Sequence, residues 1–171
     1  MNSAQALRRE AKKLISRYLS DVDMSTDPRN VRTDVFKLAE RIGIAVKNST
    51  FSDEISGLLL KKDNNLLIVV NCEHHPHRQR FTVAHELGHY ILHGGETIHY
   101  DVSGEPLYFR SDSIYNADER EANRFAAELL MPEHLVSRCI EAGTCTVETL
   151  SEIFDVSEDA MRYRLINLGY M

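Results

Sequence analysis

Residues 81–93 of this 171-residue chain read FTVAHELGHYILH and contain the pattern His85-Glu86-x-x-His89. Side chains four residues apart on an α-helix differ by about 40° around its axis, so both imidazole rings leave the same face. Glu86 lies at the edge of that face, where its carboxylate would reach a water molecule on a cation held by the two rings. The pattern therefore predicts a metal-binding helix. The alternative is a helix with two surface histidines and a solvated glutamate.

The other face of this helix is apolar and indicates how the helix packs. That face is formed by Val83, Leu87, Tyr90 and Ile91. Gly88 carries no side chain, which permits another element to approach the helix closely. His93 is turned about 80° from His85 around the axis, so we expect it beside the metal rather than among its ligands. The apolar face is expected to be buried against the core.

A catalytic metal site of this kind needs a third protein ligand, and residues 118–132 supply a candidate. This segment is patterned as a helix whose apolar stripe consists of Ala122, Phe125, Ala126 and Leu129. Glu119 and Asn123 border the stripe, so Glu119 can point inward at a metal whereas Glu121 faces solvent. We expect Asn123 to orient one of the histidines through a hydrogen bond. The alternative for Glu119 is a capping box with Asn116 at the start of the helix.

The remaining patterns predict an α+β fold in which a small antiparallel or mixed three-stranded sheet packs on helices. The expected strands are the β-type runs at residues 44–46, 55–60 and 66–70, with a hairpin turn at residues 63–65. The expected helices span residues 4–19, 31–41, 77–93 and 116–130, followed by two or three short helices between residues 133 and 168.

The composition is that of an ordinary globular protein, with 43% hydrophobic and 27% charged residues. Its net charge of −6 argues against a broad nucleic-acid-binding face, because such a face needs an excess of basic residues. No apolar run approaches the ~20 residues that a membrane span needs, and the charged N-terminal residues do not form a signal peptide. The three cysteines contain no C-x-x-C pair, so no disulfide framework is expected. We predict a cytoplasmic protein without a membrane partner.

Two motifs, in this order, resemble the ImmA/IrrE family of small bacterial and phage metallopeptidases. The first is the segment 81–93, and the second runs Glu119-x-Glu-Ala-Asn-x-Phe-Ala-x-x-Leu-Leu-Met-Pro132. The runs Ile55-Ser-Gly57 and Ile68-Val-Val-Asn71 also resemble this family's usual lead-in to its metal helix. The resemblance covers residues 31–132 well and the C-terminal tail more loosely.

The resemblance implies that His85 and His89 are zinc ligands, that Glu119 is the third ligand and that Glu86 is the catalytic glutamate. Mn²⁺ is the alternative metal. Zinc held by two imidazoles and a carboxylate keeps a position open for water and lowers the pKa of that water to roughly 7. Glu86 would take the proton of this water as a general base, and the hydroxide would attack a peptide carbonyl. The oxyanion donor stays open among His93, His99, Tyr100, Tyr108 and Tyr115.

The activity implied by the resemblance is that of a zinc-dependent endopeptidase whose substrate is a helix-turn-helix repressor or an antitoxin-like regulator. Two functions of other classes stay open beside it. One is a metal-stabilised module that binds and neutralises a partner protein without cutting it. The other is a DNA-binding regulator.

Residues 147–169 read as helix, short turn, helix, with Ser157 as the N-cap of the second helix, and resemble a helix-turn-helix. The second helix begins Ser-Glu-Asp, which places two acidic residues where a DNA-reading helix would meet phosphate or bases. A structural or protein-docking role is therefore favoured over DNA contact. We divide the chain into a zincin-like metallopeptidase domain at residues 1–135, including the N-terminal helices, and a helical extension packed on it at residues 136–171.

Overall fold

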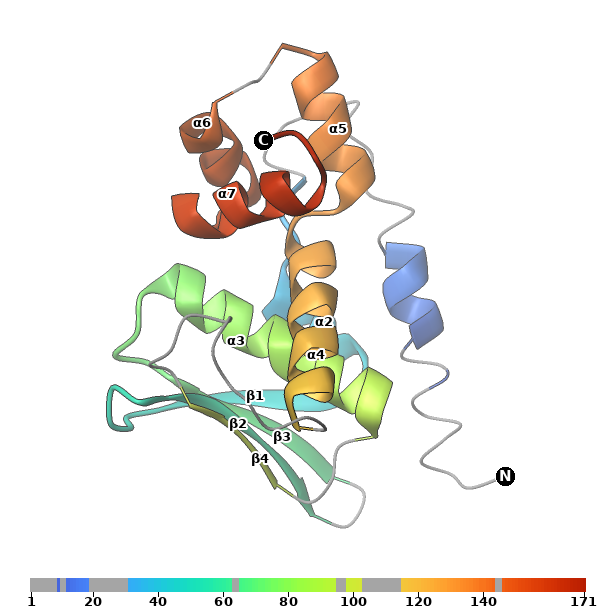
Figure 1. The fold of residues 1–171 in the computed structure, drawn as a ribbon. Coiled ribbons are helices and arrows are strands. Elements are labelled where there is room, and N and C mark those ends of the chain that lie inside the picture. Colours follow the sequence, from blue (N-terminus) through green and yellow to red (C-terminus); the bar gives the residue numbers. More distant parts are fainter. Residues whose placement is uncertain are drawn as a thin grey trace.

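The computed structural model of the chain describes residues 9, 12–18, 31–62, 65–94, 98–102, 115–143 and 146–171. A four-stranded sheet is covered on one face by helices α2 (Val35–Arg41) and α3 (Pro76–Gly88). Helix α4 (Tyr115–Leu130) crosses α3, and three further helices continue beyond its C-terminal end (Figure 1). Within the predicted N-terminal helix, residues 12–18 are helical and Ile15 is buried. The hairpin turn predicted at residues 63–65 lies mostly outside the described residues.

The sheet is mixed, which is one of the two arrangements expected from the sequence, and its strand order is β1-β3-β2-β4. Strands β1 (Ile44–Ser49) and β3 (Asn65–Asn71) are parallel, whereas β2 (Ile55–Lys62) is antiparallel to β3. The predicted α+β class is confirmed. The fourth strand, β4 (Ile98–Val102), pairs antiparallel with β2 at the edge of the sheet. The sequence patterns did not predict this strand.

Helix α3 packs closely on the sheet at a glycine in β2. A Cβ atom at Gly57 would stand 2.5 Å from Cγ2 of Thr82 and 2.7 Å from the backbone oxygen of Val69. No side chain fits in that space without displacement of the helix or the neighbouring strand. Under the helix, Ile68 and Val70 of β3 are completely buried. Gly57 therefore sets the distance between the sheet and the helix that carries the histidines.

Two helix boundaries differ from the predicted ones. Helix α2 begins at Val35 rather than at residue 31, because the carboxylate of Asp34 accepts a hydrogen bond from the backbone N–H of Lys37 and caps the helix there. The helix predicted at residues 77–93 consists of α3 and a five-residue π-helical turn, η2 (His89–His93). Such π-helical turns occur frequently at functional sites, and hydrophobic periodicity does not reveal them.

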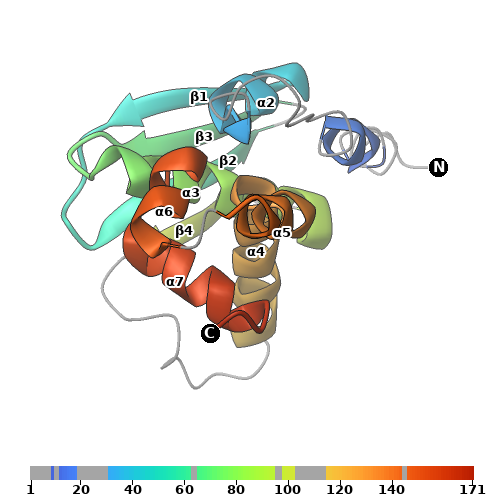
Figure 2. The ribbon, with the colours of Figure 1, turned by 90° about the horizontal axis from the view of Figure 1, so that it is seen from above.

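Three short helices follow α4: α5 (Glu133–Glu141), α6 (Val147–Phe154) and α7 (Glu158–Asn167). The hydroxyl of Ser157 accepts a hydrogen bond from the N–H of Ala160, which confirms the predicted N-cap of α7. The turn between α6 and α7 contains Asp155 at φ 55°, in the left-handed region. Figure 2 shows α6 and α7 packed side by side, with the C-terminal end of α7 next to α4. The buried side chains of both helices belong to one hydrophobic core with those of α3 and α4. The division at residue 135 stays a prediction.

Across the ranges given above, the structure has no helix with the length and apolar character needed to cross a lipid bilayer.

Candidate metal centre

The two histidines of the quoted pattern lie together in the interior of the protein. His85, near the end of α3, is 2% exposed, and His89, where η2 begins, is 4% exposed. Their Nε2 atoms are 2.9 Å apart, and their rings meet edge to face with centroids 4.5 Å apart. The alternative interpretation of two surface histidines is therefore wrong. Buried polar groups are normally paired with a partner. The position of Glu119, the third predicted ligand, therefore decides whether the two rings belong to a metal site.

Glu119 of α4 lies against both rings. Its Oε2 atom is 3.3 Å from Nε2 of His85, and its Oε1 atom is 3.4 Å from Nε2 of His89. Helix α4 begins at Tyr115, so Glu119 lies in its second turn. Its side chain points inward and does not cap the N-terminus of the helix, which was the alternative interpretation. Glu121 is exposed, as its position on the helix predicts.

The spacing of these atoms fits a shared metal ion. A tetrahedral zinc ion with bonds of about 2.0–2.1 Å separates its ligand atoms by about 3.3 Å. The three distances among the imidazole nitrogens and the carboxylate oxygens, 2.9, 3.3 and 3.4 Å, are close to that value. In the part of the chain that the structure describes, this is the one group of three His, Cys, Asp or Glu side chains able to hold a metal ion. Two imidazoles and a carboxylate are also a donor set that zinc accepts in catalytic sites.

Asn123 orients the ring of His85, and His93 lies next to the ring of His89, with centroids 5.5 Å apart. The amide oxygen Oδ1 of Asn123 lies 2.9 Å from Nδ1 of His85, as expected from the sequence. An N–H at Nδ1 donates to this oxygen and leaves Nε2 with its lone pair toward the metal position. His93, at the end of η2, places Nε2 3.1 Å from the backbone oxygen of Asp118. His93 therefore lies beside the metal position and connects η2 to the residue that precedes Glu119.

Helices α3 and α4 meet at a glycine. A Cβ atom at Gly88 would be 3.0 Å from Cα and 3.1 Å from the backbone oxygen of Ala122. Ala122 is completely buried at this contact. Ala122 lies one turn after Glu119 on α4, and Gly88 precedes His89. The close approach that the sequence predicts near Gly88 is confirmed, and it brings the carboxylate of Glu119 within reach of the rings.

Glu86 is completely buried, immediately after His85 in α3. Burying a carboxylate costs free energy unless hydrogen bonds or a positive charge compensate it. A divalent cation between the three ligands would add positive charge next to this helical turn. The location is suitable for a carboxylate that exchanges a proton at the site.

Sequence reasoning missed Phe81 and the cleft that adjoins the candidate metal ligands. The ring of Phe81 stacks on that of His85, with centroids 6.2 Å apart and planes inclined by 29°. Phe81 also lines a cleft of about 790 Å³ between α4 and α7, together with Asn123 and Tyr163. The i, i+4 spacing of Phe81 and His85 was a signal for the ring contact. The cleft depends on α7, which is distant in the sequence. The proposed oxyanion residue Tyr108 and the side chains of the other candidates in β4 and at Tyr115 lie outside what the structure describes.

Metallopeptidases hold zinc and activate water with a particular arrangement of residues. It consists of a histidine pair on one helix, a glutamate between the two histidines in sequence, and a carboxylate on a neighbouring helix. The chain belongs to the peptidase family described as the IrrE N-terminal-like domain, whose family model matches residues 39–166. This membership confirms the resemblance drawn from the two motifs.

Three curated relatives are similar to parts of this chain. It is 32% identical over 102 residues to the radiation response metalloprotease IrrE of Deinococcus radiodurans, and 33% identical over 102 residues to that of Deinococcus deserti. These matches cover 58% of this chain but only 30% and 35% of the relatives. It is 31% identical over 105 residues to the uncharacterized immunity region protein 2 of Bacillus phage phi105, covering 60% of this chain and 61% of the phage protein. The chain thus spans about a third of the length of the two Deinococcus proteins.

Proposed function

We propose that this protein is a zinc-dependent endopeptidase that hydrolyses a peptide bond in a partner protein. In this proposal His85, His89 and Glu119 hold the zinc, and Glu86 is the general base. The observation that carries the proposal is the convergence of two imidazole nitrogens and a carboxylate, 2.9–3.4 Å apart, in the protein interior. Membership of a peptidase family supports the reaction class.

Each residue of the site has a distinct task in this proposal. Asn123 holds the ring of His85 so that Nε2 faces the metal position. The carboxylate of Glu86 accepts a proton from the attacking water and passes it to the amine that leaves when the peptide bond breaks. Zinc, when bound, supplies Lewis acidity toward the carbonyl and lowers the pKa of water. The surrounding apolar core excludes bulk solvent and so strengthens the electrostatic interactions within the site.

The donor set favours zinc over manganese. Two of the three side chains are imidazoles, which suit zinc, whereas manganese is usually bound by carboxylate, carbonyl and water oxygens. Mn²⁺ stays the alternative, and metal analysis of the purified chain distinguishes the two. A matched pair of variants tests the third ligand. Glu119→Gln is expected to lower bound zinc from about one ion per chain to well below that, while Glu121→Gln, on the exposed side of α4, should retain it.

We further propose that the substrate is a transcriptional regulator, either a helix-turn-helix repressor or an antitoxin-like protein, and that cleavage occurs in the cytoplasm. Support comes from the relatives: one is called an immunity region protein, and two are called radiation response metalloproteases. The resemblance of the two motifs to the ImmA/IrrE family also implies a regulator as the substrate. The alternative is that the chain binds and neutralises such a regulator without cutting it.

Mass spectrometry of new protein N-termini tests the reaction and the substrate class together. Wild-type protein and the Glu86→Gln variant are expressed at equal levels in the same bacterial host, and zinc content is measured for both. We expect new termini in a DNA-binding regulator with the wild type alone, while the variant still holds zinc. Equal cleavage by the zinc-loaded variant would overturn the role of Glu86. A regulator that is bound but never cut by the wild type would favour the neutralising module.

A further inference from the structure

The cleft between α4 and α7 is lined mainly by residues of α3, α4 and α7, and α3 and α4 also carry the proposed metal ligands His85 and Glu119. It measures about 790 Å³, within the range of about 300–1,000 Å³ typical of ligand-binding clefts. Phe81 of α3 and Asn123 of α4 lie in its wall, and both contact His85. A chain segment that occupies this cleft therefore passes next to a residue of the metal site.

The charged residues of the cleft are mostly basic, although the chain as a whole is acidic. Three arginines, Arg120, Arg124 and Arg164, line it together with one acidic residue, Glu128. Glu128 forms an ion pair with Arg164, which also donates from Nε to the backbone oxygen of Met131 at 2.9 Å. Arg164 makes these internal contacts, and the side chains of Arg120 and Arg124 are exposed at the cleft. A basic cleft in a chain of net charge −6 is a local feature that favours an anionic partner.

The uncharged part of the cleft is apolar and aromatic. Phe81, Met131 and Tyr163 line it, and Tyr163 is 45% exposed. Exposed aromatic side chains beside arginines are typical of surfaces that bind protein segments. The combination fits a peptide with acidic and apolar side chains better than it fits DNA.

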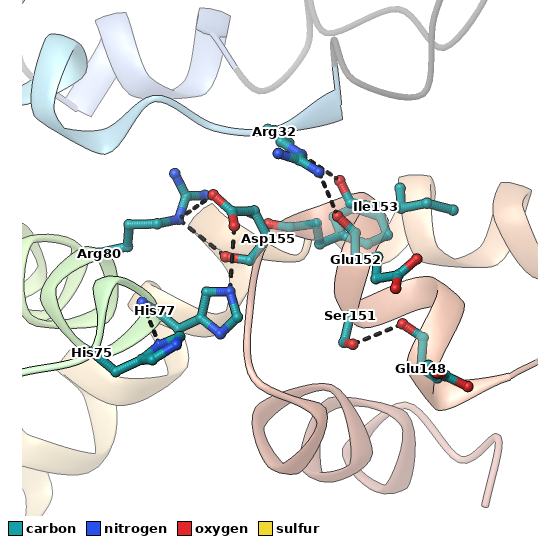
Figure 3. Close-up of polar contacts among 10 residues, drawn as sticks. Arg32, His75, His77, Arg80, Glu148, Ser151, Glu152, Ile153 and Asp155 are labelled. Atoms are coloured by element: carbon teal, nitrogen blue, oxygen red, sulfur yellow. Dashed lines mark hydrogen bonds and ion pairs between the residues drawn. The ribbon is translucent and has the colours of Figure 1, made fainter.

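The wall formed by α7 is attached to the metal helix through the end of α6, as Figure 3 shows. Arg80 of α3 donates from Nε to the backbone oxygen of Asp155 at 3.1 Å, and the same Nε atom is 3.3 Å from Oδ2 of that carboxylate. Arg32 donates to the backbone oxygen of Glu152 at 2.8 Å. Cations at the C-terminal end of a helix are also stabilised by the helix dipole. These contacts hold α7 at a set position relative to the residues that carry the metal ligands.

We propose that the α4–α7 cleft binds an acidic and apolar segment of the protein substrate, with Arg120 and Arg124 recognising its carboxylates. This inference rests on the proposed peptidase function, because the segment bound here is the one that leads to the metal site. It assigns the C-terminal helices to substrate recognition rather than to DNA contact.

Binding to an inactive protein tests the inference without requiring cleavage. The zinc-loaded Glu86→Gln chain is titrated against two fluorescein-labelled probes, the peptide Glu-Leu-Glu-Ala-Leu-Glu and its counterpart with Gln at every Glu position. Fluorescence anisotropy is expected to show about fivefold or greater preference for the acidic peptide at low salt, decreasing as salt is added. Adding Arg124→Glu should abolish this preference and shift binding toward a third probe that carries Lys at the same positions. A reversal of preference cannot arise from a loss of folded protein.

Arg162→Glu is the matched control, because Arg162 is exposed on α7 and does not line the cleft. It makes the same change of charge and should leave the preference for the acidic peptide intact. Equal affinity for the acidic and neutral peptides would overturn the proposal, as would an equal loss in the two arginine variants. Displacement of the acidic peptide by a 20-base-pair DNA duplex, with the same dependence on Arg124, would replace the peptide with DNA as the occupant. If the peptide preference holds while the wild type cuts no protein, the peptidase function fails and the binding cleft stands.

Discussion

At the scale of single residues, the site depends on the direction in which each ring nitrogen points. His85 has two nitrogens, and the contact of Nδ1 with the amide oxygen of Asn123 at 2.9 Å leaves Nε2 for the metal. Without that acceptor, the ring can rotate and can carry its proton on either nitrogen. In the proposed zinc site, Asn123 therefore acts on the metal through His85.

Replacing Asn123 by Ala is expected to weaken zinc binding by about 10–100-fold, the usual effect of losing a hydrogen-bond partner of a ligating histidine. Chelator competition with purified protein measures this directly. Asn123→Asp retains an oxygen acceptor and should restore most of the affinity, which a merely structural role would not explain. Wild-type affinity in Asn123→Ala would contradict the assignment.

Individual residues also show which parts of the candidate site could be predicted from the sequence. The spacing of His85 and His89 predicts a shared face because the periodicity of a helix is local. The wheel position of Glu119 predicts an inward direction, and the structure places this carboxylate 3.3 and 3.4 Å from the two rings. The same periodicity could have predicted the stacking of Phe81 on His85. An aromatic residue at this spacing, however, is ordinarily interpreted as part of the hydrophobic core.

At the scale of elements, the distance between α3 and α4 decides whether the ligands can share an ion. A Cβ atom at Gly88 would meet backbone atoms of Ala122 at 3.0 and 3.1 Å, and backbone cannot swing aside as a flexible side chain would. A methyl group at this position must push α4 away by a few tenths of an ångström.

Gly88→Ala is therefore expected to weaken zinc binding severalfold, because Glu119 moves with α4. Overpacking costs about 1–3 kcal/mol of unfolding free energy, and the removal of a glycine from the helix returns about 0.5–1 kcal/mol. We expect a net loss of up to about 2 kcal/mol in urea unfolding of the metal-free protein. Glu121→Ala, on the exposed side of α4, is the control for both measurements. Unchanged zinc affinity in Gly88→Ala would show that the distance between α3 and α4 does not determine the geometry of the zinc site.

At the scale of the whole molecule, Arg80 holds the C-terminal helices against the helix that carries His85, and Arg32, which precedes α2, holds the end of α6. Arg80 is mostly buried, with a side chain only 12% exposed. Burial lowers the pKa of its guanidinium, and the carboxylate of Asp155 opposes that shift, so the group retains its charge in the interior. His77 adds a contact of 3.3 Å between its Nε2 atom and Oδ1 of Asp155.

Arg80→Met should loosen the C-terminal helices while leaving the metal ligands in place. Hydrogen bonds to charged groups contribute about 1.5–3 kcal/mol, so we expect a loss of that order in unfolding free energy. Hydrogen exchange followed by mass spectrometry should show faster exchange in α6 and α7 than in α3. Arg162→Met removes an exposed arginine of α7 and should change neither measurement. Equal exchange in wild type and Arg80→Met would mean that apolar packing alone holds these helices.

The sequence by itself determined the metal helix, the apolar faces that bury it and the residue types able to bind a metal, since these follow from periodicity within one element. It also determined the N-cap at Ser157 and three of the four strands. Only the tertiary structure decided that Glu119 and Asn123 meet His85, that η2 continues α3, and that α7 closes a basic cleft beside the site. Most of these features depend on contacts between residues distant in the chain. The close approach at Gly57 was not predicted by any local pattern, and at Gly88 the sequence predicted a close approach but not that its partner is Ala122.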